Sequence, residues 1–238
     1  MFKSQMIAEN VKIVREKIRN ACLAARRSPD SVTLIGVSKT FDDNSIAEAI
    51  HAGLLDIGEN YVQEVSEKRE KLSDDRIRWH FIGHLQSNKV KYIADWVHLI
   101  HSVDNERVAS EIQKRAIKLG RSIDVLIEVN TSGESSKFGV KPEEADGLAR
   151  QVSGFSGIRL RGLMTIGPFS DEMEQSRMAF RKLKAVFDEV NDAGFLKQKM
   201  EHLSMGMSHD FIAAIEEGST MVRIGTAIFG SRQTANVN

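Results

Sequence analysis

The stretch TLIGVSKTF, Thr33 to Phe41, has the composition of a strand that is buried on both faces, and it ends in a lysine. Such strands are typical of parallel sheets covered by helices. An open doubly wound sheet is one possible fold, but its Gly-x-Gly-x-x-Gly turn is missing after this first strand. The stretch therefore favours a closed barrel. It also raises the question of whether Lys39 is a surface charge or an active amine.

Similar apolar runs follow along the chain and alternate with helical patterns. The eight predicted strands are residues 33–38, 55–59, 78–82, 97–101, 124–130, 159–165, 202–205 and 221–224. The helices predicted between and after them are residues 44–51, 61–72, 87–94, 105–119, 142–151, 171–191 and 208–217. Eight such units within about 200 residues predict a single (β/α)8 TIM barrel. We expect one domain over 1–238, with an amphipathic N-terminal helix in 1–28, the barrel in 31–230 and a short tail in 231–238.

Composition narrows the possible functions. The 238 residues contain 33 basic and 33 acidic side chains, so no broad field favours nucleic acid or an anionic membrane. Cys22 is the only cysteine, which excludes an internal disulfide and a cysteine-based zinc cluster. No run of about 18 apolar residues and no signal peptide is present. We therefore expect a soluble, cytoplasmic protein with no nucleic-acid or membrane partner.

Two glycine-containing loops lie where barrels commonly hold phosphate, after the seventh and eighth strands. The first is SMGMSHD, Ser204 to Asp210, and the second is RIGTAIFG, Arg223 to Gly230. Each loop alone is compatible with an ordinary turn, but both together favour an anion site whose backbone N–H groups bind a phosphate.

Arg223 interrupts an apolar strand, and burying such a charge is costly without a partner. If Val222 and Ile224 face the helices, Arg223 points into the barrel. An ion pair with Glu59 or Glu128 is the structural alternative.

Barrel closure places the eighth strand beside the first, so Lys39, Arg223 and both loops converge. An amine beside a phosphate site suits a phosphorylated aldehyde such as pyridoxal 5′-phosphate, with Arg223 at its ring nitrogen.

Two further features have plainer interpretations. His80 and His84, like His98 and His101, are close in sequence, but no carboxylate or cysteine spacing supports a metal site. We expect surface or hydrogen-bonded histidines and no metal. Lys137 in the polar loop after the fifth strand is either an exposed lysine or a transient second amine near the cofactor.

Ordered motifs along the chain strongly resemble the pyridoxal phosphate homeostasis protein family, also called YggS/PROSC. The matching segments are VSKT (37–40), GENYVQE (58–64), WHFIGHLQSNK (79–89), GLMTI (162–166), HLSMGMSHDF (202–211) and VRIGTAIFG (222–230). The resemblance implies a barrel like the alanine racemase N-terminal domain, which is a pyridoxal phosphate protein of fold type III. It also implies a binder that regulates vitamin B6 pools without an established catalytic activity.

The resemblance further implies the roles of individual residues. Lys39 would carry the cofactor as a reversible Schiff base, Arg223 would contact the pyridine nitrogen, and Asn60 would lie near the cofactor. Phosphate contacts, mostly from backbone amides, are implied for Ser204, Gly206, Met207, Ser208, Gly225 and Thr226. An arginine at the ring nitrogen cannot keep that nitrogen protonated, which disfavours carbanion chemistry.

We accordingly expect a monomeric carrier that passes pyridoxal phosphate transiently to apo-enzymes. The second domain through which alanine racemase completes its site and dimerises has no counterpart in the short stretch SRQTANVN, 231–238. A racemase-like enzyme and a Schiff-base aldolase remain alternatives, as does a binding module whose partner recognises the loaded state.

Overall fold

The computed structural model describes residues 2–168 and 172–231. Eight parallel strands form a closed barrel in which each strand lies beside its neighbours in sequence, and β8 pairs with β1 to complete the circle. The strands are β1 Thr33–Val37, β2 Asp56–Glu59, β3 Arg78–Phe81, β4 Leu99–Val103, β5 Ile123–Glu128, β6 Ile158–Met164, β7 His202–Ser204 and β8 Met221–Ile224. The predicted (β/α)8 barrel is therefore confirmed.

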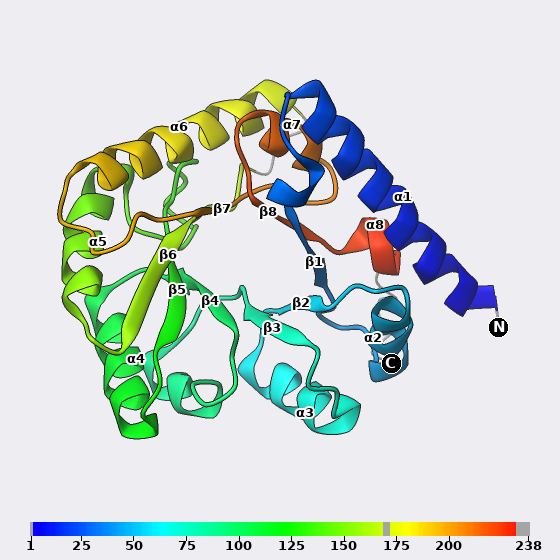
Figure 1. Ribbon diagram of the computed structural model, residues 1–238, viewed down its shortest axis with the longest axis horizontal. Coiled ribbons are helices and arrows are strands. Elements are labelled where there is room, and N and C mark those ends of the chain that lie inside the picture. The colour runs from blue at the N-terminus through cyan, green and yellow to red at the C-terminus, as the bar shows by residue number, and fades with distance from the viewer. Residues whose placement is uncertain (1, 169–171, 232–238) are drawn as a thin grey trace.

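The helices surround the strands (Figure 1). The α-helices are α1 Phe2–Ala24, α2 Asp43–His51, α3 Val62–Leu72, α4 Glu106–Leu119, α5 Ala145–Gly154, α6 Met173–Asp192, α7 Phe211–Glu216 and α8 Thr226–Phe229. Three short 3-10 helices are η1 Pro29–Ser31, η2 Ser87–Tyr92 and η3 Pro142–Glu144. The additional helix α1 packs against α2, α7 and α8 through its predicted apolar face, where Val11 and Cys22 are buried.

The predicted elements differ from the structure mainly at their ends. Every predicted strand overlaps an observed one, and β8 has the predicted bounds. Residues 87–94, predicted as a helix, form only the 3-10 turn η2, and the helix predicted from residue 208 begins at Phe211 because 207–210 form a turn. Helix α8 was not predicted. Of the predicted tail, 232–238 lie outside the described residues.

The barrel has two apolar layers. A small cluster fills its interior, formed by Ile35, Leu99, Leu126, Met164 and Met221. A larger layer between strands and helices contains Val222 and Ile224. The predicted alternation along β8 is therefore confirmed, and it places Arg223 on the interior side with Met221.

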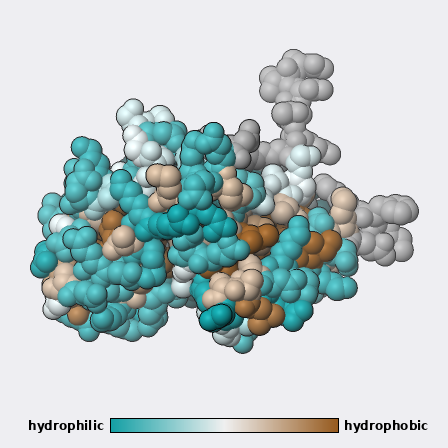
Figure 2. All heavy atoms as spheres, turned by 90° about the horizontal axis from the view of Figure 1, so that it is seen from above, coloured by the Kyte–Doolittle hydropathy of each residue, from teal (hydrophilic) through white to brown (hydrophobic). Residues whose placement is uncertain are grey.

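The outer surface is mixed. Seen from above the view of Figure 1, it is largely hydrophilic with small scattered hydrophobic groups (Figure 2). Ion pairs such as Arg181 with Glu217 join α6 to the end of α7. Within 2–168 and 172–231, no helix is both long and apolar enough to cross a membrane.

Candidate functional site

Lys39 follows the last residue of β1 by two positions, and the backbone on both sides of it is fixed. The Lys68 ammonium, which is buried, donates to the Ser38 carbonyl at 2.7 Å and to Glu59 Oε1 and Glu64 Oε1 at 2.6 Å. Glu64 Oε1 also accepts the Thr40 N–H at 2.6 Å. A lysine and two carboxylates therefore hold the residues before and after Lys39.

The same turn is held against the end of β8. Thr40 has a left-handed backbone, with φ of 69°, which is uncommon for a β-branched residue and indicates a conformation imposed by its surroundings. The Phe41 ring packs on Phe229 of α8, with centroids 5.2 Å apart. A Cβ built on Gly225 would lie 3.4 Å from the Val37 carbonyl oxygen. The chain that carries Lys39 therefore lies beside the second predicted anion loop, as expected.

The two predicted anion loops present backbone donors at this end of the barrel. The N–H groups of Gly206, Ser208, Gly225 and Thr226 have no hydrogen-bond acceptor among the described residues. Two bonds join the loops: the Ala227 N–H donates to Ser208 Oγ at 3.3 Å, and the Arg223 N–H donates to the Gly206 carbonyl at 3.0 Å. An anion placed between these loops would satisfy donors that the protein leaves open.

Two other predicted phosphate residues already have protein partners. The Met207 N–H donates to Asp210 Oδ1 at 2.6 Å, which closes the turn before α7. The Ser204 hydroxyl lies inside the barrel, where it contacts Arg223 and His101. In this conformation neither group is directed to a phosphate, so the contacts expected from these two residues stay predictions.

Arg223 is buried at the interior end of β8 and is held by neutral groups. Its Nη1 donates to the carbonyl and the hydroxyl of Ser204, both at 2.7 Å, and its Nη2 donates to the Thr165 carbonyl at 2.8 Å. The alternative of a direct ion pair with Glu59 or Glu128 is wrong for the described residues, since neither acid is within ion-pair distance. Two of the five guanidinium N–H donors have no acceptor among the described residues. Burial lowers the pKa of Arg223 to about 10, so it stays cationic near neutral pH.

Glu128 is the buried acid whose negative charge acts most strongly on the pKa of Arg223. It is the last residue of β5 and is 4% exposed. Burial, together with the negative charge of Asp104, raises the pKa of Glu128 to about 7, although Arg223 acts in the opposite direction. Burial also raises the pKa of Asp104. The site therefore contains one fixed cation and one carboxyl group that can exchange a proton near neutral pH.

Asn60 follows β2 directly and lines a groove of about 550 Å³ together with Phe81 and His84. Its Oδ1 is buried and has no hydrogen-bond partner among the described residues. An unpartnered buried acceptor is costly, so Asn60 has bonding capacity that the described residues do not use. The groove is not lined by Lys39, Arg223 or either anion loop, and the place of Asn60 near a cofactor therefore stays a prediction.

The remaining candidates have structural contacts. The Lys137 ammonium donates to Glu134 Oε1 at 2.7 Å and to the Gly167 carbonyl at 2.8 Å, so it is not a freely exposed amine. The His84 ring stacks on Phe138 with centroids 3.8 Å apart. Within the described ranges, no group of three or more metal-ligating side chains is arranged to hold a metal ion.

Several residues of the site were not found from the sequence. Glu64 and Lys68 lie four residues apart on α3, which is a spacing that indicates a helix ion pair but not contact with the turn of Lys39. Asp210 could have been recognised as a turn acid three residues after Met207. His101 gave no signal of its role because its partners lie on other strands.

Comparisons with known proteins show the family of the chain. Residues 4–233 match the family model of the alanine racemase N-terminal domain. The pyridoxal phosphate homeostasis protein of Aquifex aeolicus is 47% identical over 225 residues, covering 94% of this chain and 98% of that protein. The protein of the same name from Escherichia coli K12 is 44% identical over 233 residues, covering 95% and 97%.

Solved structures share the fold of this chain. The structure of PipY from Synechococcus elongatus PCC7942 with PLP bound has a TM-score of 0.82 at 33% identity, covering 94% of this chain and 100% of that one. The barrel of alanine racemase from Corynebacterium glutamicum, at 14% identity and a TM-score of 0.76 over 64% of that chain, shares the fold. The site thus lies in a racemase-type barrel. The chain belongs to the pyridoxal phosphate homeostasis protein family.

Proposed function

We propose that this protein binds pyridoxal 5′-phosphate (PLP) reversibly at the end of the barrel where the strands end, and that it acts in intracellular vitamin B6 homeostasis. The observation that carries the proposal is the set of open donors around Lys39: four backbone N–H groups on two joined loops and two N–H groups of Arg223. The names of the relatives and the PLP-bound PipY structure support it.

Each set of donors matches one chemical group of PLP. The N–H groups of Gly206, Ser208, Gly225 and Thr226 suit a phosphate dianion. Arg223 can donate but cannot accept, which suits an unprotonated ring nitrogen. When bound, PLP supplies an aldehyde carbon that the Lys39 amine can attack, forming a reversible C=N bond with loss of one water. Lys68 and Glu64 keep the turn of Lys39 in place for this contact.

We propose a carrier rather than a strong catalyst. A group that holds a proton on the ring nitrogen would make PLP a strong electron sink, and Arg223 does not supply that proton. A carrier must also release its load. A dissociation constant near micromolar corresponds to about 8 kcal/mol, which holds the ligand without trapping it. We propose that apo-enzymes in the cytoplasm receive the load from a monomeric barrel.

The test is a titration of purified protein with PLP, followed by visible absorbance. We expect a saturable band in the parent protein and its loss in Lys39→Ala. Lys114→Ala, which changes an exposed lysine on α4, should behave as the parent does. A parent protein without a saturable band would overturn the proposed binding.

The carrier role needs a second measurement. Parent protein is incubated with PLP, freed of excess PLP and mixed with a PLP-dependent apo-enzyme. The enzyme activity recovered is compared with that from Lys39→Ala protein incubated and freed of excess PLP in the same way. We expect recovery only with the parent. Equal recovery from both samples would refute delivery from the Lys39 site.

A further inference from the structure

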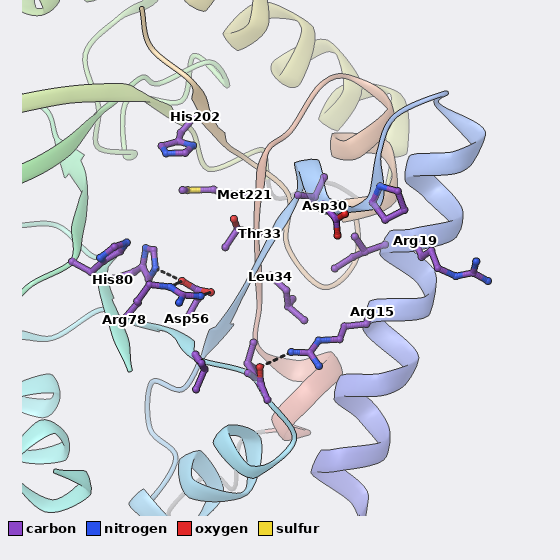
Figure 3. A pocket seen from close by; sticks show the side chains of 17 residues that line it. Arg15, Arg19, Asp30, Thr33, Leu34, Asp56, Arg78, His80, His202 and Met221 are labelled. Carbon is purple, nitrogen blue, oxygen red and sulfur yellow. Dashed lines mark hydrogen bonds and ion pairs between the residues drawn. The ribbon is translucent and has the colours of Figure 1, made fainter. Parts of the chain in front are cut away.

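A second cavity lies at the opposite end of the barrel, where the strands begin. It has a volume of about 690 Å³ and is lined by the first residues of several strands, among them Thr33, Asp56, Arg78 and His202. Figure 3 shows His80, Arg78 and Asp56 turned toward one another at its inner wall. Both Asp56 oxygens accept from the Arg78 guanidinium, at 2.6 and 2.5 Å.

A continuous hydrogen-bonded path runs through the barrel interior from this cavity to Arg223. Asp56 Oδ1 lies 3.0 Å from His80 Nε2, and His80 Nδ1 lies 2.9 Å from His101 Nε2. His101 Nδ1 lies 2.9 Å from Ser204 Oγ, which accepts from Arg223 Nη1 at 2.7 Å. Residues from β2, β3, β4, β7 and β8 contribute to the path in turn.

For neutral histidine rings, the two ends of the path determine the direction of every bond in it. Arg223 can only donate, so Ser204 Oγ accepts from it and directs its own hydrogen to its other contact among the described residues, His101 Nδ1. His101 then carries its proton on Nε2 and donates to His80 Nδ1.

His80 in turn donates from Nε2 to Asp56. Asp56 is fixed as an acceptor: burial acts to raise its pKa, but the bonds from His80 and Arg78 bring the pKa down to about 2.

Burial prevents water from substituting for any partner in this path. The side chains of His80, His101 and Ser204 are at most 1% exposed, so no bulk water replaces a missing partner. Burial, with a smaller contribution from the positive charge of Arg223, lowers the pKa of His101 well below its ordinary value, which keeps the ring neutral. A neutral ring that accepts at Nδ1 takes the Ser204 hydrogen and so fixes the hydroxyl with its lone pairs toward Arg223.

We propose that His101, oriented by His80 and Asp56, is a positioning residue that fixes Arg223 through Ser204 and so directs the free guanidinium donors to an aromatic ring nitrogen in the site. The inference rests on the proposed function, because a pyridine-type ligand supplies that nitrogen. It assigns to Ser204 a role toward the ring nitrogen rather than toward the phosphate.

The first test uses protein without cofactor. Two-dimensional NMR of protein with 15N-labelled histidine reports which ring nitrogen carries the proton. We expect a neutral His101 ring with its proton on Nε2, and a proton on Nε2 of His80, with the His101 signals assigned from their loss in His101→Leu. A proton on His101 Nδ1, or a charged His101 ring, would overturn the assignment.

The second test separates positioning from general damage to the fold. Dissociation constants are measured for PLP and for its 1-deaza analogue, which has a carbon in place of the ring nitrogen. We expect His101→Leu to weaken PLP by about tenfold and to leave binding of the analogue within about threefold. A similar loss for both ligands, or no loss for PLP, would refute positioning of Arg223 toward the ring nitrogen.

Two matched variants complete the design. His101→Asn can still accept from Ser204 and should bind PLP within about threefold of the parent. His51→Asn removes an exposed imidazole on α2 that is outside the path, and should change neither ligand's binding. The outcomes are distinguishable from failure of the proposed function, since a parent protein that does not bind PLP contradicts that function, whereas normal PLP binding by His101→Leu contradicts only the path.

Discussion

Replacing Glu128 by glutamine should stabilise the cofactor-free protein at alkaline pH. The folded state raises the pKa of Glu128 to about 7, from an ordinary value of 4.5. Between these values the folded protein retains a proton that the unfolded chain has lost, so the contribution of Glu128 to stability is present at low pH and disappears as pH rises to about 7. The difference corresponds to about 3 kcal/mol, at roughly 1.4 kcal/mol per pH unit.

The assay is urea unfolding of the parent and Glu128→Gln at about pH 5 and about pH 8. Glutamine is neutral throughout, so we expect an advantage of at most about 1 kcal/mol for the variant at the lower pH and of about 3 kcal/mol at the higher pH. Glu143→Gln, at an exposed position, serves as the control and should not change the pH dependence. A difference between parent and Glu128→Gln that is the same at both pH values would refute the reasoning.

Two substitutions test the supports of the site. Lys68→Met leaves Glu59 buried without its cation and should cost about 3 to 5 kcal/mol in urea unfolding, whereas the exposed Lys71→Met on the same helix should cost little. Gly206→Ala should cost about 1 to 3 kcal/mol, because φ is 97° and the new Cβ would lie 2.5 Å from that of Ala214. Gly147→Ala, within α5 and without close neighbours, should instead stabilise by about 0.5 to 1 kcal/mol. Equal effects within either pair would contradict these assignments.

The sequence predicted the barrel because its strands carry a local signal. Strands covered on both faces appear as short apolar runs, and their alternation with helices specifies parallel pairing. The interior position of Arg223 was predictable for the same reason, since residues of one strand alternate between two faces. The start of the helix predicted from 208 was less predictable, because the turn that precedes it depends on the bond between Asp210 and Met207.

The interior contacts could not be predicted from local patterns. The hydroxyl that contacts Arg223 is determined by the register between β7 and β8 and by the width of the barrel. In this structure that hydroxyl belongs to Ser204. The spacing of His98 and His101 suggests a pair, yet His101 contacts His80 and Ser204 on other strands. In the same way, a charge pattern on α3 did not reveal that Lys68 holds the turn of Lys39.

The most direct test of the central claim is to find which amine becomes linked to PLP. Protein is incubated with PLP, reduced with cyanoborohydride to make the C–N bond permanent, digested and analysed by mass spectrometry, with Lys39→Arg treated in parallel. We expect the added mass on the peptide that contains Lys39, and its loss from that peptide in the variant. Label found mainly on Lys137, or spread over exposed lysines while Lys39 stays unmodified, would contradict the claim.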